Sequence, residues 1–276
     1  MDNLIEIVLL GVLQGIAEFL PISSSGHLNI AQAALKQFSS RSLPDAMTVT
    51  IALHLGTLVS ILVVYWQRIW RLLGADRHVI GHVIVGTLPA GIVGVALHEW
   101  MKASPPLKEA FSSPMLAGCM LLFTGVMLIY AGRRPPGETD YTGMTYRQAF
   151  MVGLVQAIAI LPGISRSGST IVGGLCVGLR RDSAATFSFL LAIPVTAGAC
   201  VVEGKDLLFG EHAPESLGLL LGGAMVSFVV GLVALRWLIA WLQAGKLHQF
   251  AWWCIPMGLL VIAWQWFDGV SAVASR

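Results

Sequence analysis

Charge is scarce in this sequence. Asp, Glu, Lys and Arg make up 12% of the 276 residues, about half of the share near 25% that is usual in soluble domains. Hydrophobic residues make up 56%, 30 glycines come on top of them, and the mean hydropathy is +0.76. So little charge cannot cover a water-facing surface, and the same figures exclude a disordered, collagen-like or coiled-coil protein. The composition therefore predicts an all-α membrane protein that crosses the bilayer several times.

Other features are missing as well. The net charge is only +2, so no basic field for nucleic acid is expected. The four cysteines lie inside apolar stretches without a close pair, which is typical of small buried side chains rather than of a disulfide or a metal site. No H-E-x-x-H, Walker or C-x-x-C motif occurs. The first residues lack the basic segment and cleavage site of a signal peptide, so we expect no cleaved leader.

Six segments are long and apolar enough to span a bilayer, which takes about 20 residues. Apart from Arg236 they contain no Asp, Glu, Lys or Arg, and Trp or Tyr stands at several of their ends, as expected at a membrane interface. The predicted spans are residues 47–66, 79–98, 114–132, 184–202, 217–238 and 250–267.

Two further apolar stretches, 4–20 and 146–162, are each cut by a short loop rich in Pro, Ser and Gly and then followed by another short apolar segment, 28–35 or 170–179. These pieces are too short to cross the bilayer comfortably. We therefore predict two hairpins that enter the membrane and return to the same side. Irregular backbone at membrane depth is tolerated only where it is buried in protein or lines a wet cavity, which marks both loops as candidate sites.

The two hairpins resemble each other. After a shift of 142 positions, a Gln, an Ile-Ala pair and an Ile-Ser-x-Ser-Gly segment coincide, and three predicted spans follow each hairpin. Because three is odd, the second copy should be inverted in the membrane, with a site where the two halves meet. We expect one integral membrane domain over 1–276, built from two inverted repeats, about 1–140 and 141–276, each a re-entrant hairpin plus three transmembrane helices.

The orientation is predicted from Lys and Arg, which collect on the cytoplasmic side of a membrane. One side of the predicted topology holds Arg68, Arg71, Arg77, Arg133, Arg134, Arg147, Arg180, Arg181, Arg236 and Lys246. The other side holds Lys36, Arg41, Lys102, Lys108, Lys205 and Arg276. The first side should therefore be cytoplasmic, and the mouth of the first hairpin should face outward.

Two charged residues at membrane depth stand out, Glu18 in the first hairpin and Arg166 in the second. An ionisable residue inside the membrane is expensive and is taken as functional by default; the alternative is a structural ion pair that holds the repeats together. Gln14 lies four residues before Glu18 and so on the same helix face. Their oxygens could bind Mg²⁺ or Ca²⁺, or Glu18 could be a general base.

Each loop opens a helix with hydroxyl groups, and Arg166 adds a guanidinium fork that suits a phosphate. Backbone N–H groups and hydroxyls at a helix start form an anion site, although a serine there could also be a nucleophile or a simple cap. His27 could move a proton or activate a serine, or be a structural interfacial histidine. His54 has no evident partner and is expected to be structural. Together these groups indicate a phosphate or diphosphate ligand.

The segments Gln14-x-x-x-Glu18-Phe-Leu-Pro-Ile-Ser-Ser-Ser-Gly-His27 and Pro162-Gly-Ile-Ser-Arg-Ser-Gly-Ser-Thr170 resemble the two signature motifs of the undecaprenyl-diphosphatase family. These are the bacitracin-resistance proteins of bacterial cell envelopes, and length, span number and interrupted hairpins are similar too. The resemblance implies a hydrolase of the bacterial inner (plasma) membrane. Its reaction would convert undecaprenyl diphosphate to undecaprenyl phosphate and phosphate, recycling the lipid carrier for peptidoglycan synthesis.

The resemblance also implies the site residues. Catalytic roles fall on Glu18, Ser24, His27 and Arg166, and a divalent cation, Mg²⁺ or Ca²⁺, is expected beside Glu18 and Gln14. Where family members carry two glutamates this chain has one, which weakens any mechanism that needs two carboxylates on the metal. Phosphate binding falls on Ser23, Ser25, Ser165, Ser167 and Thr170.

The hypothesis is a phosphatase site between the hairpins that faces the periplasm or cell exterior. Ser24 is the leading nucleophile, with His27 or Glu18 as its base, and attack by a water activated by one of these two is the alternative. The rival function is a transporter or flippase of a polyprenyl phosphate lipid, because inverted repeats with broken helices are typical of alternating access. Glycines along the spans permit close packing, within one chain or in a homodimer.

Overall fold

A computed structural model describes residues 2–38, 46–135, 137–208 and 217–274. These residues are mostly helical, and the only β-type pairing among them is an isolated bridge between Thr139 and Leu179, which confirms the predicted all-α class. The helices are α1 (Asp2–Ala17), α2 (Ser24–Phe38), α3 (Ala46–Val64), α4 (Trp66–Leu72), α5 (Val79–Ala103), α6 (Pro105–Phe111), α7 (Pro114–Gly132), α8 (Tyr146–Ile158), α9 (Arg166–Cys176), α10 (Arg181–Leu208), α11 (Leu217–Gln243), the 3₁₀ helix η1 (Leu247–Phe250) and α12 (Ala251–Ala274).

The predicted spans are present in this structure. Five segments are long and apolar enough to cross a membrane, and α3 together with α4 makes a sixth if the 75° bend between them is counted within one span. Their outer faces carry exposed apolar side chains, such as Leu88 at 50%, Val126 at 62% and Val233 at 65% exposure. An exposed apolar surface on helices long enough to span a bilayer is typical of contact with lipid. The protein is therefore a multi-pass membrane protein.

The two interrupted stretches form helix–loop–helix hairpins, α1 with α2 and α8 with α9. With 11 residues, α9 reaches only about 16 Å, so it cannot cross the bilayer alone. The two loops pack against each other. A Cβ on Gly26 would lie 2.9 Å from the Cα of Gly163, and a Cβ on Gly168 would lie 3.0 Å from the Cβ of Pro21. A glycine at positions 26 and 168 permits this close approach. The two contacts are equivalent in the two hairpins, because Gly168 lies 142 positions after Gly26 and Gly163 lies 142 positions after Pro21.

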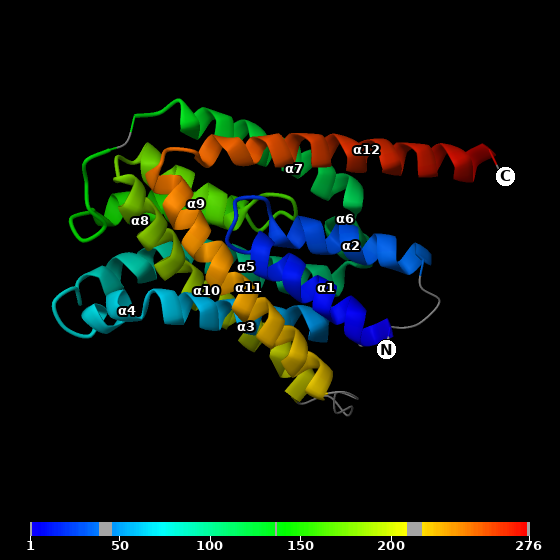
Figure 1. Cartoon of the computed structure of the whole chain (residues 1–276), viewed down its shortest axis with the longest axis horizontal. Helices are drawn as coiled ribbons and strands as arrows, with labels where there is room; N and C mark the ends of the chain where they lie inside the picture. The colour runs from blue at the N-terminus through cyan, green and yellow to red at the C-terminus, as the bar shows by residue number, and fades with distance from the viewer. Residues whose placement is uncertain (1, 39–45, 136, 209–216, 275–276) are drawn as a thin grey trace.

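Equivalent helices of the two halves also pack in equivalent ways, each against a helix of the other half. Figure 1 shows α1 beside α11 and α12 along α7, and α8 packs on α5 in the corresponding way. The α7–α12 pair is antiparallel, because Gly118 faces Ile262 while Gly132 faces His248. A two-fold axis in the membrane plane would produce this pattern. The inverted repeat, and the boundary near residue 140, stay predictions.

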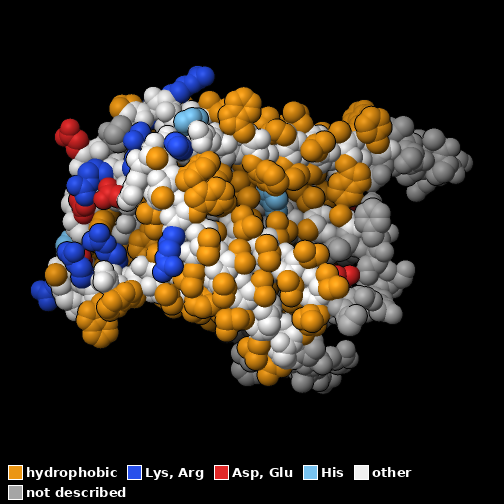
Figure 2. Space-filling model, viewed as in Figure 1, with side chains coloured by type: hydrophobic (Ala, Val, Ile, Leu, Met, Phe, Trp, Pro, Cys, Tyr) orange, Lys and Arg blue, Asp and Glu red, His pale blue; other side chains and the backbone are white. Residues whose placement is uncertain are grey.

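Most of the Lys and Arg residues that were predicted to be cytoplasmic lie at one end of the molecule, where blue side chains cluster in Figure 2. We call this end the Arg-rich end. The loops there are tied together, since the Nε2 of His78 lies 2.9 Å from the carbonyl oxygen of Thr142 and Arg180 pairs with Asp140 at 2.5 Å. On the other predicted side, the side chains of Lys36, Arg41, Lys205 and Arg276 lie outside the described residues. The orientation in the membrane stays a prediction.

Asp140 organises the loop at the Arg-rich end. Burial by itself raises the pKa of the Asp140 carboxyl. Hydrogen bonds from the N–H and hydroxyl of Thr142 and from Ser183, together with the charge of Arg180, lower the pKa by more than burial raises it. The pKa is therefore below its ordinary value. The carboxylate form is therefore favoured in the folded protein.

Candidate active site

Both hairpin loops start their second helix in the same way. Ser23 precedes α2, and its Oγ accepts the N–H of Gly26 at 3.3 Å; Ser165 precedes α9, and its Oγ accepts the N–H of Gly168 at 3.1 Å. These are N-caps, and they repeat under the shift of 142 positions. Ser23 also has a φ of 72°, which is uncommon for a residue other than glycine and is found most often at functional sites.

Glu18 is the centre of the site. It follows α1, is 7% exposed, and both of its carboxylate oxygens are engaged. One oxygen, Oε2, accepts the hydroxyl of Ser24 at 2.7 Å and the amide of Gln14 at 3.0 Å. The other, Oε1, pairs with the guanidinium of Arg166, which lies 148 positions further along the chain. The structure thus brings together three of the four predicted catalytic residues, Glu18, Ser24 and Arg166, with Gln14 beside them.

Arg166 is the first residue of α9, so its backbone lies among the N–H groups that have no partner within the helix. Its Nη2 contacts Glu18, whereas its Nη1 is buried and has no hydrogen-bond partner among the described residues. A buried guanidinium donor without a partner is costly. A bound anion would supply the missing acceptor, and the helix dipole favours negative charge at the same place.

The predicted phosphate-binding hydroxyls divide into two groups. Ser25 lines the cavity beside Ser24, whereas the others are at most 2% exposed and bond within the protein. Thr170 donates to the carbonyl oxygen of Arg166 and lies 2.5 Å from the hydroxyl of Ser188, which fastens α9 to α10. The remaining residues of the buried group are Ser23, Ser165 and Ser167.

The cavity has a volume of about 430 Å³, within the usual range of ligand sites. Glu18, Ser24 and Arg166 form its polar end, and much of the remaining wall comes from α5 and α10, including Gly91 and Pro194. One end can therefore bind a charged group, and the other can accommodate an apolar chain.

His27 does not line this cavity. Its Nδ1 lies 2.9 Å from the carbonyl oxygen of Ser23, and its Nε2 accepts the indole N–H of Trp253 at 2.9 Å. Both ring nitrogens are therefore engaged, with Nδ1 carrying the proton. His27 joins α2 to α12 and lies apart from Ser24 and Glu18.

His54, and not His27, is the histidine that lies next to the carboxylate of Glu18. Its Nε2 lies 3.6 Å from Oε2 of Glu18, its Nδ1 lies 2.8 Å from the carbonyl oxygen of Thr50, and it lines the cavity. The expectation that His54 has no partner was wrong, because the structure places it beside Glu18. The signal was its position in a span without other charges, because an ionisable side chain at membrane depth marks a functional site by default.

Comparison with known proteins identifies the family. The profile described as "Bacitracin resistance protein BacA" matches residues 7–260. The chain belongs to the BacA family. It is 54% identical to a protein of Rhodopirellula baltica named undecaprenyl-diphosphatase, over 95% of this chain and 98% of that protein. Proteins with the same name from Desulfatibacillum aliphaticivorans and Methanosphaera stadtmanae are 40% and 34% identical, over 94% and 95% of this chain and 97% and 98% of theirs.

The residues of this BacA-family chain fit a divalent cation only in part. The described residues contain no group of three or more His, Cys, Asp or Glu side chains that could hold a metal. However, the Oε1 of Gln14 is buried and has no partner in the described part of the chain, and rotating this amide would bring that oxygen beside Oε2 of Glu18. One carboxylate and one amide suit Mg²⁺ when water and phosphate oxygens complete its shell.

Proposed function

We propose that this protein hydrolyses undecaprenyl diphosphate to undecaprenyl phosphate and inorganic phosphate, which would give resistance to bacitracin. The relatives named undecaprenyl-diphosphatase and the family profile support this activity. The observation that carries it is the 2.7 Å hydrogen bond from Ser24 to Glu18, next to Arg166, at the polar end of a cavity whose wall is otherwise mostly apolar.

The geometry favours Ser24 as the nucleophile and Glu18 as its base. The Oγ of Ser24 attacks the terminal phosphorus and its proton passes to Glu18, while the bond from phosphorus to the oxygen of the prenyl monophosphate breaks. Water then hydrolyses the phosphoserine, which releases inorganic phosphate and returns the proton to Ser24. Glu18 suits this role because Ser24 already donates to it, whereas both nitrogens of His27 are engaged elsewhere.

Arg166 stabilises the charge on the transferred phosphoryl group. Donors that are positioned before the reaction and excluded from water act most strongly where charge develops. Its buried Nη1 has no partner among the described residues, so it is available to a phosphate oxygen. Ser25 and the first-turn N–H groups of α2 and α9 supply further donors at the same place.

The apolar wall of the cavity binds the start of the prenyl chain. Gly91 and Gly198 line the cavity, and a Cβ on either would meet nothing within 4 Å. The missing side chains leave room for the lipid between α5 and α10. A phosphatase embedded in the bilayer can thus receive its substrate without drawing the long chain into water.

A divalent cation completes the site in this proposal. Glu18 and Gln14 would hold it together with oxygens of the diphosphate, and it would neutralise charge on those oxygens. We expect Mg²⁺ to bind weakly alone and more tightly with a non-hydrolysable prenyl bisphosphonate. Calorimetric titration measures this without turnover, and the Gln14→Glu variant should raise the affinity of the protein for the cation.

The protein would lie in the bacterial inner (plasma) membrane with the cavity open to the periplasm or cell exterior. The concentration of Lys and Arg at the opposite end supports this orientation. Maleimide labelling of single-cysteine variants in intact cells tests it, because a cysteine on the side of Lys108 should react and one at Arg134 should not. The reverse pattern would contradict the orientation.

Phosphate release by the purified protein from undecaprenyl diphosphate, or a shorter prenyl diphosphate, tests the function. The Ser24→Ala variant should lose nearly all activity, while Ser112→Ala, at the residue that follows α6, should keep it. Mass spectrometry should detect a phosphoserine at Ser24 after rapid quenching. Full activity of Ser24→Ala would instead indicate direct attack by water, and lipid binding without any phosphate release would favour a transporter or flippase.

A further inference from the structure

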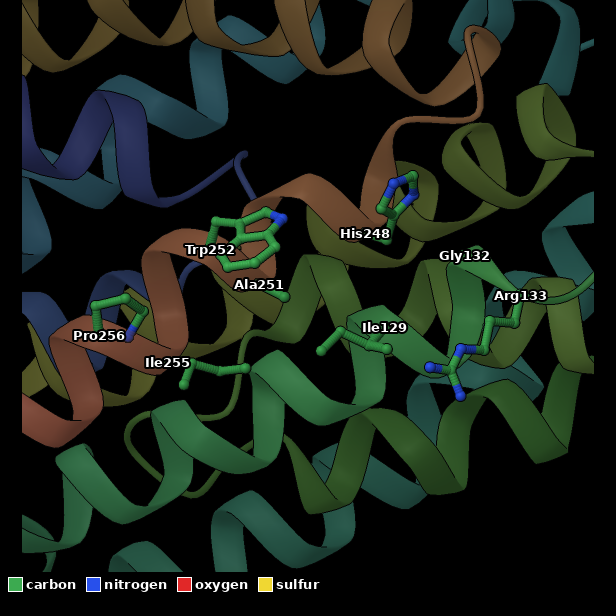
Figure 3. A pocket seen from close by; sticks show the side chains of 8 residues that line it. All are labelled: Ile129, Gly132, Arg133, His248, Ala251, Trp252, Ile255 and Pro256. Carbon is green, nitrogen blue, oxygen red and sulfur yellow. The ribbon is translucent and has the colours of Figure 1, made fainter.

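A second hollow lies at the Arg-rich end, where the end of α7 meets η1 and the start of α12 (Figure 3). We call it the α7–α12 groove. Its volume is about 530 Å³, and it contains none of the site residues described above. Its lining residues are Ile129, Gly132, Arg133, His248, Ala251, Trp252, Ile255 and Pro256.

The groove is separate from the active site. Thr124 of α7 donates to the carbonyl oxygen of Gly163 in the second hairpin loop, and Arg133 follows nine residues later. Nine residues of α-helix correspond to about 14 Å along the axis. The groove therefore lies toward the membrane interface that is opposite the mouth of the cavity.

One end of the groove is cationic and rich in donors. Figure 3 shows the guanidinium of Arg133 and the ring of His248 at this end. Arg133 is exposed and forms no ion pair with any described residue, and the Nδ1 of His248 is buried without a partner. No Asp or Glu lines the groove. An anion would pair with Arg133 and would also accept a hydrogen bond from the Nδ1 of His248 when that nitrogen carries the proton.

The other end is apolar and faces the surrounding lipid. Ile255 and Pro256 lie at this end in Figure 3. Trp252, which is 81% exposed, forms the rim. Tryptophan at this depth is typical of the level of the lipid headgroups. The chemistry of the groove therefore changes along its length from cation to hydrocarbon, as it does in an amphiphile with an anionic head.

We propose that the α7–α12 groove binds an anionic phospholipid of the surrounding bilayer. The lipid phosphate contacts Arg133 and His248, and the first part of the acyl chains lies along Ile129, Ile255 and Trp252. Basic pockets between transmembrane helices bind such headgroups. The charge complementarity, and the position at the interface where phospholipid headgroups are concentrated, favour this occupant over a free anion or a protein partner.

Native mass spectrometry of the purified protein with added lipid tests the proposal without reference to phosphatase activity. The wild type should bind one phosphatidylglycerol about five- to tenfold more tightly than phosphatidylcholine of the same chains, because both lipids carry a phosphate but the quaternary ammonium of phosphatidylcholine cancels its charge beside Arg133. The Arg133→Gln variant should lose this preference. The Ile129→Gln variant should instead weaken the binding of both lipids and keep the preference, because the two lipids have the same chains; thermal unfolding checks that both variants are folded.

Arg134→Gln is the matched control. Arg134 is the adjacent arginine, but it contacts Tyr130 and does not line the groove, so its loss changes the net charge equally. It should leave the lipid preference within twofold of wild type. An equal loss in Arg134→Gln, no preference in the wild type, or displacement of phosphatidylglycerol by undecaprenyl phosphate at lower concentration would overturn the proposal. Failure of the proposed phosphatase function would leave these measurements unchanged.

Discussion

Replacing Arg166 by lysine separates a catalytic arginine from a structural ion pair. In the folded protein the Nη2 of Arg166 contacts Glu18, while its Nη1 has no partner among the described residues. One guanidinium nitrogen therefore forms the ion pair, and the other is available to a phosphate oxygen. Lysine keeps the charge but offers a single nitrogen. It can pair with Glu18 or bind a phosphate oxygen, but it cannot hold both in the same geometry.

The magnitude follows from the contact that is lost. A hydrogen bond to a charged group contributes about 1.5–3 kcal/mol. Losing one such bond in the transition state lowers kcat/KM by about 10- to 150-fold. The fold should survive, because the carboxylate keeps a cationic partner; leaving a buried charge unpaired, as in Arg166→Ala, costs about 3–5 kcal/mol.

The assay is phosphate release from a prenyl diphosphate in detergent, with thermal unfolding measured on the same preparations. Arg77→Lys, on the loop at the Arg-rich end, is the matched control and should keep full activity. A wild-type rate for Arg166→Lys, together with an unchanged Tm, would refute the phosphate-binding role and leave only the structural ion pair.

Three further predictions concern other parts of the molecule. Gly91→Leu should raise KM for a long prenyl diphosphate several-fold by filling the cavity, whereas Gly222→Leu, at an equally open position outside it, should not; steady-state kinetics compare the two. Trp253→Phe leaves the Nε2 of buried His27 without its donor, so it should lower the free energy of unfolding by about 1–3 kcal/mol with phosphate release within twofold of wild type; a large loss of rate would instead assign His27 to catalysis. Because the pKa of Asp140 is lowered in the folded state, its carboxylate stabilises the protein above the ordinary carboxyl range near pH 4 and this contribution disappears as pH falls through the folded pKa. The Tm difference between wild type and Asp140→Asn should therefore be present at pH 7 and shrink in acid, and a constant difference would contradict this.

The membrane class, the spans and the two hairpins could be predicted from the sequence because their causes are local. A run of apolar residues settles where a helix can cross lipid. Pro21 follows the break after α1, and Ser23 and Ser165 cap α2 and α9, all within a few residues of each helix end. Glu18 and Arg166 could also be selected, because a charge at membrane depth is costly wherever its partner lies.

Only the tertiary structure decided which of these residues meet. Glu18 and Arg166 are 148 positions apart, and their pairing depends on glycines that let the two loops touch. His27 bonds to Trp253 at a separation of 226 positions, so it lies away from the cavity, while His54 on α3 lies beside Glu18. Neither outcome could be predicted from spacing, because local patterns set the helix and its faces, whereas the neighbour of each face depends on close packing between distant helices.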